Sequence, residues 1–173
     1  KAASKARQQW QNAEPADHKH PYLIKKGIQP YGIRQIDDDL IVPVFVEGEI
    51  SSVQRITPTG DKRFLKGGQT RSGYYQIGKF GDRIYIAEGF ATGASIHEAT
   101  GEGVAVAYNA GNLKPVAQAL RESSDKRIVI AGDDDRFTNG NPGRSKAEEV
   151  LAHVENTSCR FPVFENAEGQ PTD

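Results

Sequence analysis

From Arg83 onward, short runs of β-branched and apolar residues alternate with segments that have helical spacing of their apolar positions. The pattern predicts strands at residues 83–87, 103–108, 127–131 and 160–164. It predicts helices at residues 91–99, 113–122 and 144–154. Because strand–helix–strand alternation produces a parallel sheet with right-handed crossovers, we predict an α/β fold with flanking helices for this half.

The first half has a different pattern, in which tight turns separate short strand candidates. Strands are predicted at residues 40–46, 50–56, 62–65 and 74–77, with Pro43 indicating an edge strand or a bulge. Such a run predicts an antiparallel meander that forms a lobe of its own. A helix is expected over residues 2–13, then a polar linker over 14–20 and a short helix from Pro21 to Lys26 that ends at Gly27.

These patterns divide the 173 residues into three parts. We predict an N-terminal helix and linker over residues 1–20, a small basic β-rich α+β lobe over 21–80 and the parallel α/β domain over 81–173. The formal net charge of −1 gives no global basic field, so any binding of a polyanion depends on a local patch.

Other features of the composition narrow the class of protein. A single cysteine excludes an internal disulfide framework, and Cys159 has no cysteine partner for a zinc site. No apolar run approaches the roughly 20 residues of a membrane span and no signal peptide is visible, so we expect a cytoplasmic protein without membrane contact. The chain contains no methionine and starts at Lys1, and we therefore expect it to be a piece of a longer polypeptide.

Carboxylates follow two of the predicted parallel strands at once. Glu88 comes after the strand 83–87, and the triplet Asp133–Asp135 comes after the strand 127–131. Because parallel strands end at one edge of their sheet, these acids should share that edge. A cluster of carboxylates repels itself unless a cation binds, and hard oxygen ligands suit Mg²⁺ or Mn²⁺. We predict that Glu88, Asp133 and Asp135 bind the metal, since alternate side chains point the same way.

Other kinds of acidic site fit this sequence less well. The triplet Asp37–Asp39 is predicted to be a solvated turn, because nothing basic or apolar is placed to use it. Phosphatases with an Asp-x-Asp-x-Thr nucleophile and phosphoryl-receiver domains carry their acid pair early, whereas here the pair follows the third strand. A dinucleotide fold requires G-x-G-x-x-G, which Glu88-Gly-Phe-Ala-Thr-Gly93 does not supply.

The order of these acids resembles the Toprim domain, which bacterial-type primases, topoisomerases and some nucleases share. Ala87-Glu88-Gly89-Phe90-Ala91-Thr92 is similar to its first motif. Tyr108-Asn109-Ala-Gly111-Asn112-Leu113 resembles the polar turn after its middle strand. Gly132-Asp-Asp-Asp-Arg136 resembles the Asp-x-Asp-Arg motif of primases, although these usually have a glycine soon after the arginine, where Phe137-Thr-Asn-Gly-Asn intervenes here.

The preceding lobe resembles the basic half of the polymerase domain in phage and plasmid primases. The similar segments are His20 to Gly27, Leu40 to Val44, Val53 to Ile56, Gly60 to Leu65 and Gly73 to Gly78. The resemblance implies that Arg55, Lys62, Arg63 and Arg71 bind nucleotide or nucleic acid. Without it, these residues and Lys66 would be read as a solvated strand face. We expect Arg55, Arg63 and Arg71 to project toward the acidic edge across a cleft.

The resemblance implies the polymerase core of a DNA primase, which is a nucleotidyltransferase that makes short RNA primers on single-stranded DNA. The implied partners are the template strand, ribonucleoside triphosphates, a fused or associated helicase and an upstream zinc-binding module. Two alternatives stay open. A Toprim nuclease or topoisomerase would use the same acids for strand cleavage, and a docking module would bind nucleic acid without catalysis.

Overall fold

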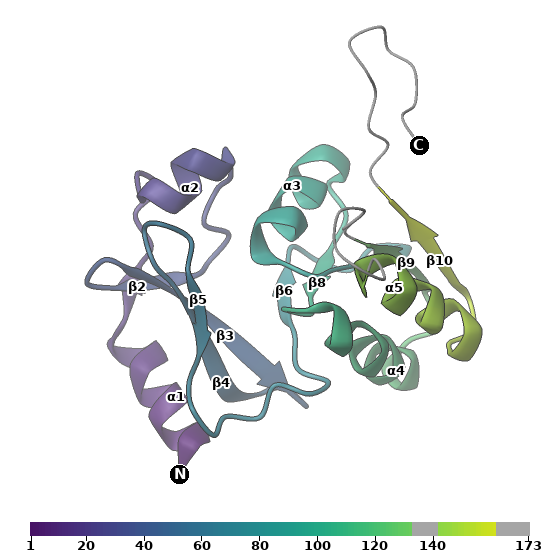
Figure 1. The fold of residues 1–173 in the computed structure, drawn as a ribbon, viewed down its shortest axis with the longest axis horizontal. Coiled ribbons are helices and arrows are strands. Elements are labelled where there is room, and N and C mark those ends of the chain that lie inside the picture. The colour runs from purple at the N-terminus through teal and green to yellow at the C-terminus, as the bar shows by residue number, and fades with distance from the viewer. Residues whose placement is uncertain (133–141, 162–173) are drawn as a thin grey trace, which may run out of the picture.

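The computed structural model describes residues 1–132 and 142–161. Within these residues the strands form two five-stranded sheets that lie side by side, the first with α1 and α2 and the second with the other helices (Figure 1). In the same ranges, no helix is long and apolar enough to cross a lipid bilayer.

The first sheet is antiparallel throughout, in the order β1-β2-β3-β4-β5. Its strands are β1 (Glu14–Pro15), β2 (Arg34–Ile36), β3 (Asp39–Val46), β4 (Glu49–Ile56) and β5 (Lys62–Phe64). The turn between β3 and β4 has Glu47 at φ +50° and Gly48 at φ +81°, which is the left-handed pair that a two-residue hairpin turn favours. The predicted run of β3, β4 and β5 is therefore confirmed, whereas β1 and β2 were not anticipated.

Two helices flank the first sheet. α1 (Ala2–Asn12) covers one face, where Ala6 packs with Ile41 and Val53. α2 (Pro21–Lys26) begins at His20, whose Nδ1 accepts a hydrogen bond from the Tyr22 N–H group, and ends at Gly27 with φ +65°. A glycine is favoured in that left-handed cap because it carries no Cβ atom.

The second sheet is mainly parallel, in the order β10-β9-β7-β8-β6. Its strands are β6 (Tyr75–Ile77), β7 (Arg83–Ala87), β8 (Val104–Val106), β9 (Arg127–Ala131) and β10 (Thr157–Arg160). β7 pairs in parallel with both β8 and β9, and β9 with β10, whereas β6 runs antiparallel to β8. This sheet with its helices confirms the predicted α/β fold.

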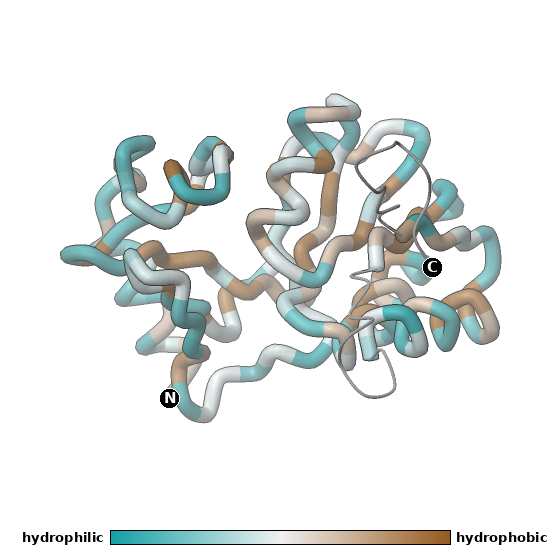
Figure 2. Tube along the Cα trace, turned by 45° about the horizontal axis from the view of Figure 1, so that its top comes forward, coloured by the Kyte–Doolittle hydropathy of each residue, from teal (hydrophilic) through white to brown (hydrophobic). Residues whose placement is uncertain are grey.

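Helices cover both faces of the second sheet. They are α3 (Phe90–Thr100), α4 (Leu113–Ser123) and α5 (Pro142–His153), with a short 3₁₀ turn η1 (Ala110–Asn112) before α4. Ile84 and Ile86 of β7 pack with residues of α4 and α5, and Ala87 packs with Phe90 of α3. Because both faces are buried, these strands read as nearly continuous apolar runs, which appear as brown segments inside the right half of the trace (Figure 2).

Expectations about three strands were wrong or only partly right. β6 was expected to end the meander, but it belongs to the second sheet. Pro43 was expected at an edge or a bulge: β3 is an inner strand, which contradicts the edge, but a register irregularity lies next to the proline, between Val44 and Phe45, in agreement with the bulge. β10 begins earlier than predicted, and the predicted residues 162–164 lie outside the described ranges. The division of the chain at residues 20/21 and 80/81 stays a prediction.

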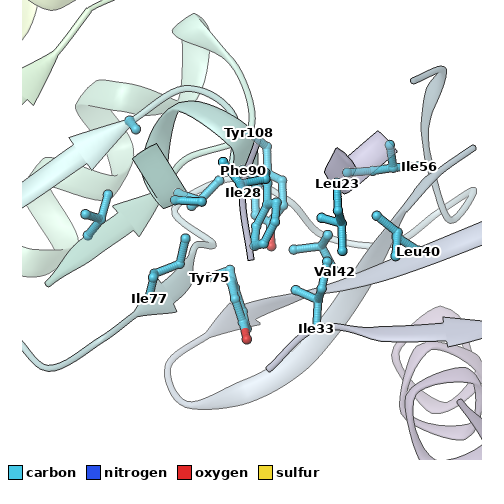
Figure 3. Packing of buried hydrophobic residues seen from close by; sticks show 14 of the residues in the cluster. Leu23, Ile28, Ile33, Leu40, Val42, Ile56, Tyr75, Ile77, Phe90 and Tyr108 are labelled. Carbon is cyan, nitrogen blue, oxygen red and sulfur yellow. The ribbon is translucent and has the colours of Figure 1, made fainter. Parts of the chain in front are cut away.

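One hydrophobic core joins the two sheets. Leu23 and Val42 of the first half pack in the same buried cluster as Ile77 and Phe90 of the second (Figure 3). A side-chain bond also joins the halves, because the Tyr75 hydroxyl donates to the Tyr31 carbonyl at 2.7 Å. The halves are therefore packed as one body around this core.

Candidate functional site

Glu88 lies where the sequence predicts it, at the carboxyl edge of the second sheet. Ala87 is in register with Val106 of β8 and Ala131 of β9, so the residues that follow these three strands meet at one edge. Glu88 is half-buried, and its Oε1 atom is shielded from solvent. The strand Arg127–Ala131 ends at this edge, and Gly132 then leads into the acidic triplet.

The predicted metal ligands Asp133 and Asp135 lie outside the described residues. Within residues 1–132 and 142–161, no three histidine, cysteine, aspartate or glutamate side chains come together. The three-carboxylate site therefore stays a prediction, which the parallel order of β7 and β9 supports. The donor chemistry fits a hard divalent cation, because Glu88 presents carboxylate oxygens at that edge.

Lys62 brings a positive charge from the first sheet to this edge. A Cβ atom placed on Gly89 would lie 3.6 Å from the Lys62 Nζ atom. Lys62 is in register with the buried Ile56, so its side chain is on the sheet face that carries the shared core. The ammonium group therefore lies beside Gly89, which directly follows Glu88.

Arg55 and Arg63 do not project toward the acidic edge, contrary to expectation. They are cross-strand partners in β4 and β5, and Arg55 is also in register with Ile41. Ile41 belongs to the cluster under α1, on the opposite face from Lys62. Together with Gln9 of α1, the two arginines line a small cleft of about 150 Å³. Alternation along the strand thus separates Lys62 from Arg63.

Asp39 is also not the purely solvated residue that the sequence suggested. Its Oδ2 atom lies 3.4 Å from Arg55 Nη1. The side chains of Arg55 and Asp39 are 36% and 29% exposed, so the pair is only partly screened by water. One acid of the Asp37–Asp39 triplet therefore orients a basic residue of the first sheet.

Arg71 lies in a third place. It lines a groove of about 1260 Å³ between the β3–β4 turn and α4, and the residues lining this groove include neither Glu88 nor Lys62. Asn112 holds the loop that carries Arg71: its Nδ2 donates to the carbonyls of Thr70 and Gly73 at 3.1 and 2.9 Å, and its Oδ1 accepts from the Ser72 N–H group at 2.9 Å. The four basic candidates thus occupy three separate surfaces.

Two aromatic residues near the site were missed by the sequence reasoning. Tyr108, with φ +74°, is buried and donates its hydroxyl hydrogen to the Pro43 carbonyl. Burial raises the pKa of Tyr108 well above its usual value, which keeps the hydroxyl protonated. Its ring meets Phe64 of β5 edge to face, with centroids 5.6 Å apart. No local pattern could reveal these contacts, because the partners lie far apart in the sequence.

Comparison with known proteins agrees with this geometry. The model of the Toprim domain matches residues 83–171, just over half of the 173 residues. The chain belongs to the Toprim family. The matched range begins with β7 and includes Glu88 and the acidic triplet, and primases of this family generally use divalent metal ions.

Two similar curated proteins are DNA primases. One DNA primase TraC of Escherichia coli is 36% identical over 180 residues, which are 96% of this chain and 12% of that protein. A second DNA primase TraC of Escherichia coli is 35% identical over 176 residues, which are 94% of this chain and 16% of that protein. The chain thus spans less than a fifth of the length of these relatives.

Solved structures share the fold. The primase fragment of the bacteriophage T7 primase-helicase protein superposes with a TM-score of 0.60 at 18% identity, over 82% of this chain and 64% of that one. The DnaG catalytic core gives a TM-score of 0.57 at 13% identity, over 96% of this chain and 71% of that one. Both sheets are therefore part of the shared architecture, since the second match covers nearly the whole chain.

Proposed function

We propose that this chain is the polymerase core of a DNA primase, which joins ribonucleotides into short RNA primers on a single-stranded DNA template. The observation that carries the proposal is the approach of Lys62 Nζ to Gly89, directly after Glu88. This places a cation of the basic sheet at the carboxyl edge of a Toprim sheet. The similarity to the two DNA primases supports the same reaction.

Glu88, Asp133 and Asp135 would hold Mg²⁺ or Mn²⁺. The bound metal would supply positive charge to the triphosphate and its pyrophosphate leaving group. Lys62 would bind the phosphates from the opposite side, where a fixed ammonium group stabilises the negative charge of the transferring phosphoryl group. Among the described residues, no side chain at this edge is placed as a strong general base, so positioning and charge would carry most of the catalysis.

Arg55, Arg63 and Arg71 would bind the nucleic acid rather than the reacting phosphates. Arg55 and Arg63 line the cleft under α1, and an arginine can fork onto a phosphate oxygen pair. A strand that passes from this face around the β5 edge would reach the Lys62 side. Each of these residues should contribute to the salt dependence of strand binding.

Further partners follow by analogy with the similar proteins. The T7 neighbour is a primase-helicase protein, and another structural neighbour is the DnaG primase catalytic domain bound to single-stranded DNA. We propose a helicase and a zinc-binding module as fused or associated partners of this chain, with single-stranded DNA and ribonucleoside triphosphates as its ligands.

A primer-synthesis assay tests the proposal. The protein is incubated with single-stranded DNA, ribonucleotides and Mg²⁺ or Mn²⁺, and the RNA products are separated by length. Glu88→Gln and Asp133→Ala should each lower the rate by roughly 100-fold or more, because removing one fixed electrostatic contact to the transition state costs about that much. Glu14→Gln, an exposed acid in β1, is the matched control and should keep the wild-type rate.

Two outcomes would contradict the proposal. Wild-type protein that nicks DNA without extending a primer would assign the site to strand cleavage. Protein that binds single strands but catalyses neither reaction would be a docking module. Melting temperatures of both variants must match the wild type, so that lost activity is not lost folding.

A further inference from the structure

Phe64 is an exposed aromatic ring beside the candidate site. Within the part of the chain that the structure describes, the large apolar residues with substantial solvent exposure are Ile24, Phe64 and Leu151, at 64%, 37% and 42%. Single exposed apolar residues are common on protein surfaces. The exposure of Phe64 is informative only together with its neighbours.

Phe64 shares its sheet face with Lys62. Gln54 is in register with Phe64, and Ile56 with Lys62, so both β5 side chains are on the face that carries the shared core. Two residues along a strand correspond to about 7 Å. The ring therefore lies one step along β5 from an ammonium group that reaches Gly89. β5 is also the last strand in the order of its sheet, which leaves an edge for a ligand.

Tyr108 supports the ring from the second half of the molecule. The two rings are 5.6 Å apart at an interplanar angle of 74°. Tyr108 is itself fixed, because it is buried and its hydroxyl donates to the Pro43 carbonyl. Phe64 is thus held against a rigid neighbour while more than a third of its surface stays exposed. A mobile surface ring would lose more conformational entropy on binding a ligand.

We propose that Phe64 is a stacking platform for a nucleobase at the active site. The inference rests on the proposed function, since it requires a nucleotide at the Glu88 edge. With its phosphates at Lys62, a nucleotide could extend along β5 and place its base on the Phe64 ring. Aromatic stacking accepts every base, which suits an enzyme that incorporates several different nucleotides. The base would come from the incoming ribonucleotide or from the template strand.

Binding measurements distinguish these two sources. Wild-type protein, Phe64→Ala, Phe64→Leu and Phe64→Trp are titrated with ATP and with inorganic triphosphate, in the presence of Mg²⁺. They are also titrated with an oligothymidylate and with an abasic strand of equal length and charge. Phe64→Ala should weaken the base-bearing ligand by roughly 5- to 150-fold, the range for one stacked base, and leave its base-free counterpart unchanged. Phe64→Trp should bind the base-bearing ligand with the affinity of the wild type, whereas Phe64→Leu should bind it much more weakly.

The controls separate stacking from structure. Leu151→Ala removes a comparably exposed apolar side chain from α5 and should change no affinity. A loss confined to ATP assigns the platform to the incoming nucleotide, and a loss confined to the oligothymidylate assigns it to the template. If Phe64→Ala does not fold, Phe64→Leu gives the same comparison with its volume largely kept.

Two results would overturn the inference. The first is unchanged affinity for all four ligands in a folded Phe64→Ala variant. The second is an equal loss for base-bearing and base-free ligands, which would make Phe64 a structural residue. Wild-type protein that binds neither ATP nor the oligothymidylate would instead contradict the proposed primase function, so the two failures are distinguishable.

Discussion

The two sheets differ in topology, and this difference determines where each sheet places its functional side chains. The first joins strands that are neighbours in the sequence, and its alternate residues point to two faces with separate surroundings. The second is built by crossovers, so the ends of β7, β8 and β9 meet at one edge although they are far apart in sequence. The crossover sheet can therefore gather chemical groups at one place, whereas the meander distributes its basic residues over several surfaces.

The comparison also shows where the halves depend on each other. Phe90 and Ile77 of the second half belong to the same buried cluster as Leu23 and Val42 of the first (Figure 3). In the described residues, the strand pairing between the two sheets is limited to the isolated bridge Phe45–Tyr74. The position of Lys62 relative to Glu88 therefore depends on the packing of the shared core. Substitutions in the shared core should therefore destabilise both halves.

The largest effect is expected from Phe90→Ala, which tests whether the halves unfold together. Phe90 is fully buried, and truncating such a ring should lower the free energy of unfolding by about 3–5 kcal/mol. Urea titrations should follow the fluorescence of Trp10, which lies on α1 in the first half, and far-UV circular dichroism, which reports mainly the helices of the second. Both midpoints should fall by the same amount.

The matched control is Ile24→Ala, because this side chain is 64% exposed. This substitution should change the free energy of unfolding by no more than about 0.5 kcal/mol. If Phe90→Ala lowers the circular dichroism midpoint and leaves the Trp10 midpoint in place, the halves are independent and the shared core is not a cooperative link.

A smaller effect is expected from Asn112→Ala, which removes one of the polar links between the halves. Asn112 is 5% exposed and bonds to Thr70, Ser72, Gly73 and Ala107. The variant removes the side-chain partner of the Ser72 N–H group and of the Gly73 carbonyl, whereas the Thr70 carbonyl keeps its bond from the Gly73 N–H group at 3.0 Å. The free energy of unfolding should fall by roughly 2–4 kcal/mol, because each buried group that loses its partner costs about 1–3 kcal/mol. Amide exchange at Ser72 should become faster.

Asn109→Ala is the comparison for this prediction. Asn109 is exposed, and its Oδ1 accepts from the Asn112 N–H group at 3.0 Å in an ordinary cap. Removing this cap should lower the free energy of unfolding by about 1 kcal/mol. Equal costs for the two variants would mean that the bonds of Asn112 to the 70–73 loop contribute little to stability.

The second half was predicted well because its signals are local. The strand at 127–131 coincides with β9, and the helix at 113–122 differs from α4 by one residue at its end. A buried parallel strand is a short apolar run, and the helix that follows has its own period, so each element is visible without knowledge of its partners. The carboxyl-edge position of Glu88 follows from the same pattern.

The first half shows what local signals omit. The sequence places Lys62 and Arg63 next to each other, but alternation in β5 sends them to opposite faces, and only the packing of α1 decides which face is which. β6 reads like another strand of the meander, yet its partner β8 is about thirty residues away. Contacts such as the hydrogen bond from Tyr108 to Pro43 depend on tertiary packing, so the local sequence pattern does not predict them.

The smallest effect is expected within the second half, at two ion pairs of Glu149, one within α5 and one from α5 to α4. Glu149 lies 2.9 Å from Lys146 Nζ and 3.2 Å from Lys114 Nζ, and its hydrogen bonds, first to Lys146 and then to Lys114, lower the pKa of the carboxyl group. A carboxyl whose pKa is lowered by folding stabilises the protein above its unfolded pKa, and this contribution disappears as the pH falls through the folded pKa.

Glu149→Gln should therefore lower the melting temperature only slightly at pH 7, by about 1–3 °C, because the group is partly exposed and water screens such pairs. The difference in melting temperature from wild type should shrink as the pH falls below the ordinary carboxyl pKa of 4.5 and vanish once Glu149 is protonated.

The control is Glu155→Gln, which removes one negative charge from an exposed acid beyond α5. Because both pairs lie in the second half, the Trp10 signal should move only with the global transition. A difference that stays constant down to pH 3 would show that Glu149 acts through packing and not through its charge.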